Sequence, residues 1–209
     1  EKTKNQKDDF VKGGRTGRMK RVLLLGDSIR MGYDSMVKEL LSDKYEVLFP
    51  EDNGRFSSYT LWQTNQCFKN EGSFDLVHWN NGYWDMNPER PMNEPIHPVE
   101  EYVSILKRMI RLIRSQNAEP VFATTTPVYK VGGAKDNTGI EAEISYQDSW
   151  VQKYNHAAKI LMQKEQVTVN DLYALCLKGE KYYKCEDMLH LTEEGYRKIA
   201  VQTAELIRN

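Results

Sequence analysis

The chain has 209 residues, of which 40% are hydrophobic and 28% are charged, and 29 Lys and Arg residues against 30 Asp and Glu residues give a formal net charge of -1. This length suffices for one domain with a full core, and the balanced charge argues against a nucleic-acid partner. No apolar run reaches the roughly 18 residues that a membrane-spanning helix needs, so we expect no membrane association.

The first segment, residues 1–18, is polar, charged and glycine-containing, which predicts a flexible leader ahead of one domain over residues 19–209. No apolar segment near the start resembles a signal peptide. We therefore expect a soluble protein, with the cytoplasm favoured over secretion.

Short apolar runs rich in strand-forming residues alternate with longer segments of helical period. The runs that predict strands are 21–26, 45–50, 74–80, 120–128 and 167–172. The segments that predict helices are 30–43, 57–70, 98–117, 147–164 and 192–207. A strand followed by a helix, repeated along the chain, predicts a parallel sheet covered on both faces, that is, a three-layer α/β/α sandwich.

Two longer segments interrupt this alternation, residues 86–98 and residues 130–147. Both follow the carboxyl end of a predicted strand, which is where open α/β sheets bind ligands. Each is a candidate for substrate contact, and a spacer is the alternative for the glycine-rich second one.

The first predicted strand ends in Gly26, Asp27 and Ser28. A strand that stops on a small turn and continues into a helix presents one side chain at the rim of a parallel sheet. Ser28 is therefore a candidate nucleophile. Because a serine hydroxyl is a weak nucleophile at neutral pH, it requires a base, a group that orients the base, and donors for the oxyanion.

Four histidines are candidates for the base. His78 lies in an apolar strand and reads as a core residue, His156 reads as a surface residue of a helix, and His97 lies in a loop between two prolines as a candidate for substrate contact. His190 follows Asp187 by three residues, and a turn of this D-x-x-H type can place the carboxylate against Nδ1 and leave Nε2 free. The alternative for Asp187 is a turn cap.

The next helix is predicted to begin at Thr192, a residue type suited to an N-cap. The order Ser28, Asp187, His190 is that of the α/β-hydrolases, but their nucleophile elbow needs glycine where this chain has Arg30. A different turn must present the serine.

These residues resemble the SGNH or GDSL hydrolase superfamily, through "GDSI" at 26–29 together with "DMLHLTEEGY" at 187–196, and the resemblance extends over residues 20–207. It implies a flavodoxin-like fold with strand order 2-1-3-4-5. It also implies Ser28 as the nucleophile, His190 as general base and then acid, and Asp187 as the group that orients His190.

The resemblance further implies an oxyanion hole that includes the backbone N–H groups of Ser28 and Gly54. The family usually has Gly-x-Asn-Asp after the third strand, but here "NNGYWDM" places Trp84 where the asparagine is expected. Either Asn80 or Asn81 can supply the missing amide, with Asn80 preferred. The alternative is that both asparagines only end the strand.

Substrate contacts are predicted for Arg30, in the first turn after the nucleophile, and for Trp84. A solvated arginine is the alternative for Arg30. Aromatic residues gather near the predicted site loops: Tyr59, Trp62, Trp79, Tyr83 and Trp84. Aromatic faces with polar neighbours suit sugar rings better than lipid tails.

The function we expect is hydrolysis of a small acyl ester, preferably acetyl, on a carbohydrate. The alternatives are an acyltransferase acting on a polysaccharide, a lysophospholipase or thioesterase, and a catalytically silent carbohydrate-binding module. No metal and no organic cofactor are expected, because a Ser-His-Asp triad with backbone donors suffices. The oligomeric state is left open.

Three cysteines, Cys67, Cys176 and Cys185, are too few and too scattered for a disulfide framework or a paired zinc site. Reduced thiols are expected. A bridge between Cys176 and Cys185 is the alternative for an exported protein.

Overall fold

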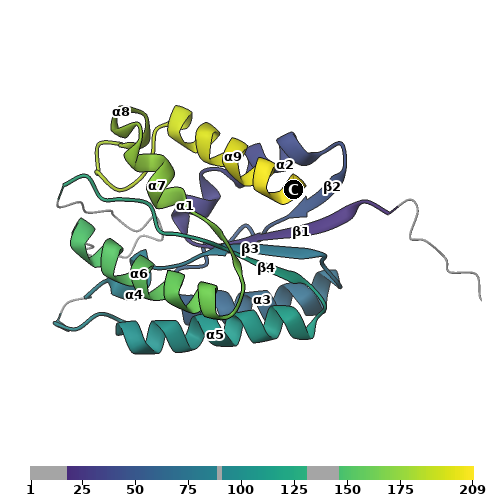
Figure 1. The fold of residues 1–209 in the computed structure, drawn as a ribbon, viewed down its shortest axis with the longest axis horizontal. Helices are drawn as coiled ribbons and strands as arrows, with labels where there is room; N and C mark the ends of the chain where they lie inside the picture. The colour runs from purple at the N-terminus through teal and green to yellow at the C-terminus, as the bar shows by residue number, and fades with distance from the viewer. Residues whose placement is uncertain (1–17, 89–90, 131–145) are drawn as a thin grey trace, which may run out of the picture.

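The structure, a computed structural model, describes residues 18–88, 91–130 and 146–209 (Figure 1). The predicted leader, apart from residue 18, lies outside the described residues, and so do residues 131–145 of the glycine-rich segment. The expected boundary between leader and domain therefore stays a prediction.

Five strands form one parallel sheet in the order β2-β1-β3-β4-β5, as predicted. They are β1 Lys20–Leu25, β2 Tyr45–Leu48, β3 Leu76–Asn80, β4 Glu119–Ala123 and β5 Thr168–Asn170. The four residues 22–25 of β1 are all buried, because helices cover the sheet on both faces and a strand in its middle meets apolar groups on each side.

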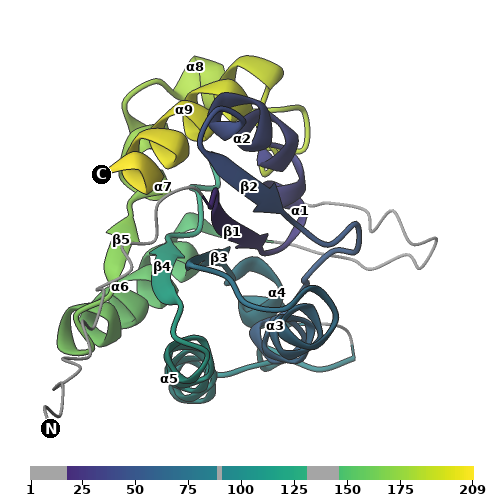
Figure 2. The ribbon, with the colours of Figure 1, turned by 90° about the vertical axis from the view of Figure 1, so that its right-hand side faces the viewer.

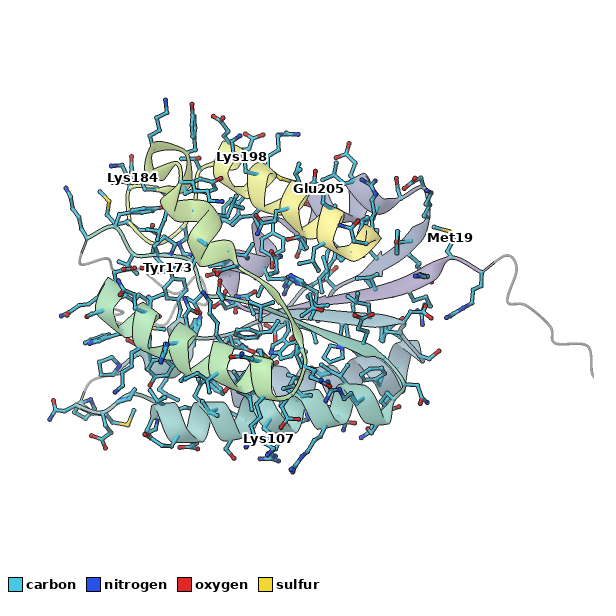
Figure 3. The ribbon with its side chains drawn as sticks, in the orientation of Figure 1. Met19, Lys107, Tyr173, Lys184, Lys198 and Glu205 are labelled. Carbon is cyan, nitrogen blue, oxygen red and sulfur yellow. The ribbon has the colours of Figure 1, made fainter. Side chains whose placement is uncertain are left out.

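Helices on the two faces complete the three layers (Figures 1 and 2). One face carries α2 Asp34–Leu41 and α9 Glu193–Arg208, and the other carries α3 Ser57–Glu71, α5 Val99–Ser115 and α6 Asp148–Lys164. Their apolar stripes face the sheet, as the buried Leu106, Ile110 and Ile113 of α5 illustrate. All five strands run toward the side where Tyr173 and Lys184 lie, opposite Met19 (Figure 3). That side holds the candidate site.

The predicted helix over 30–43 is divided into α1 Ser28–Met31 and α2. The division falls at Gly32, where an added Cβ would lie 2.2 Å from the ring of Tyr196 in α9. Three further short helices were not predicted: α4 Tyr83–Met86, α7 Leu172–Leu177 and α8 Glu180–Tyr183. None is long enough to show a helical period in the sequence.

Within the described residues, no helix is long and apolar enough to cross a membrane. All three cysteines have free thiols: Cys176 is buried in α7 and Cys185 is exposed on the segment after α8. The alternative of a disulfide between these two residues is therefore not realised in this structure.

Candidate active site

Ser28 lies at the carboxyl end of β1, in the first position of α1. The turn before it depends on Gly26, whose φ is 145° and whose added Cβ would lie 2.1 Å from Oδ1 of Asn80. Asp27 is the N-cap of α1 and accepts a hydrogen bond from the backbone N–H of Ile29 at 3.0 Å. The turn is therefore closed from both sides, and the serine begins the helix at the rim of the sheet.

The structure brings the three predicted catalytic residues together. Nε2 of His190 lies 2.8 Å from Oγ of Ser28, and Nδ1 of His190 lies 2.5 Å from Oδ2 of Asp187. With Nδ1–H held by the carboxylate, the Nε2 lone pair faces the serine hydroxyl, which is the arrangement a general base requires. The side chains of His190 and Asp187 are each 28% exposed, so the relay is reachable from solvent.

Asp187 also shapes the turn that carries His190. Its Oδ1 accepts the backbone N–H groups of Leu189 at 3.0 Å and of His190 at 2.8 Å, and Met188, which follows Asp187, has a φ of 60°. Partial burial raises the pKa of Asp187, but the hydrogen bonds from His190 and from the two backbone N–H groups outweigh it, and the pKa is lowered. The carboxylate stays charged at neutral pH and can stabilise an imidazolium.

Two hydrogen bonds of the Thr192 hydroxyl hold this turn between α8 and α9. Thr192 caps α9, as predicted, by accepting the backbone N–H of Gly195 at 3.2 Å, and its hydroxyl donates to the carbonyl of Tyr182. Gly195 has no room for a side chain, because an added Cβ would lie 2.3 Å from that same carbonyl. The base is thus positioned by the packing of one short helix on the start of a long one.

Asn80, the last residue of β3, and Asn81, which follows it, are both buried, and their amides are directed to different partners. Nδ2 of Asn80 donates to Oδ1 of Asp27 at 3.0 Å, which leaves one of its two hydrogens without an assigned acceptor. Nδ2 of Asn81 donates to the carbonyl of Arg55 at 3.1 Å and to Oγ1 of Thr60 at 2.8 Å. The oxyanion role is therefore contradicted for Asn81, whose hydrogens are both engaged, and stays a prediction for Asn80.

Gly54 lies beside the nucleophile turn, but its backbone N–H is not free. It donates to the carbonyl of Gly26 at 2.8 Å, and an added Cβ on Gly54 would lie 2.6 Å from the same oxygen. The predicted oxyanion role of Gly54 is wrong for this structure, because its donor is engaged; a close approach to β1 is what requires the glycine. The backbone N–H of Ser28 has no acceptor among the described residues and remains the predicted donor.

Arg30 is 1% exposed, so the predicted contact with substrate is wrong. Its Nη1 donates to Oδ2 of Asp34 at 2.5 Å and to the carbonyl of Pro50 at 2.9 Å, and its Nη2 donates to the carbonyl of Asp52 at 2.9 Å. These bonds tie the start of α1 to the segment that leads to Gly54. The sequence could not indicate this, because an arginine in a first turn commonly faces water.

The predicted aromatic cluster separates into core residues and surface residues. Trp79 and Tyr83 are buried in the core, Trp84 is half-buried against it, and its predicted substrate contact stays a prediction. Tyr59 and Trp62 lie on α3 with ring centroids 5.4 Å apart and an interplanar angle of 31°. Trp62 is 55% exposed.

Two charged residues that the sequence analysis did not assign complete this surface. The Arg55 guanidinium lies 5.2 Å from the centroid of the Tyr59 ring, and the Tyr59 hydroxyl donates to Oδ2 of Asp52 at 2.5 Å. We call Tyr59 and Trp62 the α3 aromatic stack, and Arg55 covers its Tyr59 end. Since Gly54 directly precedes Arg55 and contacts Gly26, this end of the stack lies beside the nucleophile turn. Nothing in the sequence singles these charges out, because charged loop residues are ordinarily solvated.

Two of the three remaining histidines, His78 and His156, lie where the sequence predicted them, in the core and on a helix surface. His78 is buried, with Nε2 3.0 Å from Nδ2 of Asn170, and burial lowers its pKa to about 4. His156 is exposed on α6. His97 is buried and its ring bonds to Asp85 and Ser58, an arrangement treated below.

Comparison with solved structures reveals extensive similarity of fold. A GDSL-like lipase from Bacteroides thetaiotaomicron superposes with a TM-score of 0.70 at 18% identity, covering 90% of this chain and 88% of that one. A lipase/acylhydrolase from Enterococcus faecalis gives 0.70 at 20% identity, covering 91% and 96%. The chain has the fold of the GDSL-like hydrolases.

An acetyl xylan esterase shares the same fold, with a TM-score of 0.64 at 19% identity, covering 90% of this chain and 99% of that one. No protein-family model and no curated protein sequence matches the chain. The expected α/β/α architecture is confirmed by these superpositions, and the activity is argued below from the site itself.

Proposed function

We propose that the protein is a serine ester hydrolase that removes a small acyl group, preferably acetyl, from a carbohydrate. The observation that carries the proposal is the continuous relay from Oγ of Ser28 through His190 to Asp187, with contacts of 2.8 Å and 2.5 Å. A serine, a base on its hydroxyl and a carboxylate on the base are the components of acyl transfer through a covalent intermediate.

In the first half of the reaction, Oγ of Ser28 attacks the acyl carbonyl carbon while its proton passes to Nε2 of His190. Asp187 stabilises the resulting imidazolium, and the Ser28 backbone N–H, with the free amide hydrogen of Asn80, donates to the oxyanion. The bond between the acyl carbon and the sugar oxygen then breaks, and that oxygen leaves with the proton from His190.

In the second half, His190 takes a proton from water, and the oxygen of that water attacks the acyl carbon. The ester bond to Ser28 breaks, Oγ regains its proton from His190, and a carboxylic acid is released. An acceptor sugar hydroxyl in place of water would give the acyltransferase alternative, so the acyl product distinguishes the two reactions.

The choice of a carbohydrate ester is supported by the α3 aromatic stack. An exposed indole at 55% exposure, stacked with a tyrosine and flanked by Arg55 and Asp52, offers an apolar face with a polar rim. That combination suits a sugar ring, which has apolar faces and hydroxyls at its edge. The fold shared with an acetyl xylan esterase is consistent with this choice.

The experiment compares wild type with Ser28→Ala on p-nitrophenyl acetate and on acetylated xylan, with Ser35→Ala as the matched control on an exposed serine of α2. Wild type and Ser35→Ala should release acetate from both substrates, and Ser28→Ala should release none above background. Equal activity of Ser28→Ala would refute the assignment. If wild type cleaves p-nitrophenyl acetate but not acetylated xylan, the proposed esterase activity stands and acetylated xylan is excluded as its substrate.

A further inference from the structure

A second serine, histidine and carboxylate lie in series away from Ser28. Oγ of Ser58 is 3.2 Å from Nε2 of His97, and Nδ1 of His97 is 2.7 Å from Oδ1 of Asp85. The three residues come from separate places in the chain: the first turn of α3, the segment before α5, and α4. The order of atoms is the same as in the Ser28 relay.

The carboxylate of this series is more deeply buried than Asp187. Asp85 is 0% exposed, and it also accepts the backbone N–H of Ser57 at 3.0 Å and the Ser57 hydroxyl at 2.5 Å. The backbone N–H of His97 donates to the Asp85 carbonyl at 3.0 Å, and the Tyr154 hydroxyl donates to the His97 carbonyl at 2.7 Å. Both the acid and the base are therefore held in place before any ligand arrives.

The electrostatics of His97 suit a base. Burial disfavours the charged imidazolium, but the hydrogen bond and the charge of Asp85, together with the charge of Glu101 on α5, outweigh it, so the pKa of His97 is raised. Nδ1–H is held by the carboxylate, which leaves the Nε2 lone pair directed at the Ser58 hydroxyl.

Ser58 also lines a groove between α3 and α5, of about 520 Å³. Its other lining residues are Leu61, Trp62, Asn65, Arg108 and Leu112. Leu61 and Leu112 provide an apolar wall for an acyl or aryl group, and Arg108 provides a cation for a polar or anionic end. The Ser58 backbone N–H has no acceptor among the described residues and lies in the first turn of a 15-residue helix, where it can donate to an oxyanion.

We propose that Ser58, with His97 as its base and Asp85 as the group that orients the base, is a second acyl-accepting serine that takes apolar acyl or aryl esters bound in the α3–α5 groove. Oγ of Ser58 attacks the carbonyl carbon and gives its proton to Nε2 of His97. The bond to the leaving alcohol breaks, and the alcohol departs with that proton. The product is an acyl ester on Ser58.

The test uses the full chain with Ser28→Ala, so that Ser28 cannot react with the probe. The protein is treated with an alkyl fluorophosphonate, which forms an O–P bond to a reactive serine and releases fluoride, and adducts are located by peptide mass spectrometry. Ser28→Ala should carry one adduct, on Ser58. Adding Ser58→Ala should remove it, and adding Ser35→Ala should leave it. An unlabelled Ser58 under conditions that fully label Ser28 in wild type would overturn the proposal.

The role of the base is tested by adding His97→Gln to Ser28→Ala. Labelling of Ser58 should slow on the order of 10², the usual contribution of a general base. Unchanged labelling would show that His97 does not act on Ser58. If this variant does not fold, the rate of labelling of Ser28→Ala is measured against pH instead: it should fall in acid as His97 becomes protonated, and a flat profile would contradict the proposal.

Discussion

Asn80 donates its side-chain amide to the buried carboxylate of Asp27 at 3.0 Å. The contact joins the carboxyl ends of β3 and β1, which are neighbours in the sheet, directly beneath the nucleophile turn. Oδ2 of Asp27 has no partner among the described residues. Because the Asp27 carboxylate is fully buried and, in the part of the chain that the structure describes, only one of its oxygens accepts hydrogen bonds, we expect its ionisation to change the stability of the fold.

The first prediction concerns that response. Burial raises the pKa of Asp27 from 3.8 to about 6, against the opposing hydrogen bond from Asn80. The folded chain holds the proton of Asp27 more tightly than the unfolded chain does. The protonated Asp27 therefore stabilises the folded state in full below about pH 4, and this contribution is lost as pH rises through about 6. The change amounts to about 3 kcal/mol in the free energy of unfolding.

Asp27→Asn keeps an oxygen for the cap but cannot ionise. Its free energy of unfolding, relative to wild type, should therefore improve by about 2 kcal/mol between pH 4 and pH 7. Urea unfolding at a series of pH values measures the difference. Parallel profiles for the two proteins would show that Asp27 does not titrate in this range.

The second prediction concerns the group that orients His190. Asp187→Asn removes the charge that fixes the tautomer and stabilises the imidazolium, so kcat on p-nitrophenyl acetate should fall on the order of 10⁴. Glu186→Gln is the matched control, since Glu186 is the exposed preceding residue, and in the described part of the chain the carboxylate on Nδ1 of His190 is that of Asp187. Similar losses in the two variants would attribute the effect to the loop and not to the relay.

The third prediction separates the two asparagines. Asn80→Ala should lower kcat on the order of 10² to 10³ with little change in KM, because an oxyanion donor acts mainly in the transition state. Asn81→Ala should lower the free energy of unfolding by about 1–3 kcal/mol, because it leaves the carbonyl of Arg55 without its donor. An unchanged kcat in Asn80→Ala would leave the Ser28 backbone N–H as the donor.

The fourth prediction concerns the buried pair of Arg30 and Asp34. Arg30→Met leaves the Asp34 carboxylate, whose side chain is 8% exposed, without its cationic partner. The free energy of unfolding should therefore fall by about 3–5 kcal/mol. Adding Asp34→Asn removes the stranded charge and should recover part of that loss. A double variant no more stable than Arg30→Met, measured by urea unfolding, would show that the charge pair is not the cause.

The sequence was sufficient for the sheet and for the relay, for identifiable physical reasons. The apolar residues 22–25 and the stripes of α5 and α9 have periods that specify strands and helices, and these long elements were placed to within a few residues. Ser28 follows a strand and His190 precedes a helix, so strand and helix boundaries located both. Side-chain direction has no such periodic signal. For that reason Arg30 and Asn81 were expected in the site, although their side chains bond inside the fold, and the sequence likewise could not show that the backbone N–H of Gly54 donates to Gly26.

The series of Ser58, His97 and Asp85 could not be found in the sequence, because Asp85 lies on a four-residue helix and His97 in a loop. The segment between them follows no period, and the serine is one of a pair at the start of α3. Only the folded chain shows that Ser57 binds the carboxylate while Ser58 meets the imidazole.

The separation of 162 residues between Ser28 and His190 has a consequence for protein synthesis. A ribosome completes β1 and the nucleophile early, but it adds the base only after four more strands have been translated. A nascent chain therefore carries a serine that cannot give up its proton, and the proposed reaction cannot begin before α9 has emerged and packed against α2. Premature termination anywhere before residue 190 yields a chain without the Ser28 activity, whatever part of the sheet has formed.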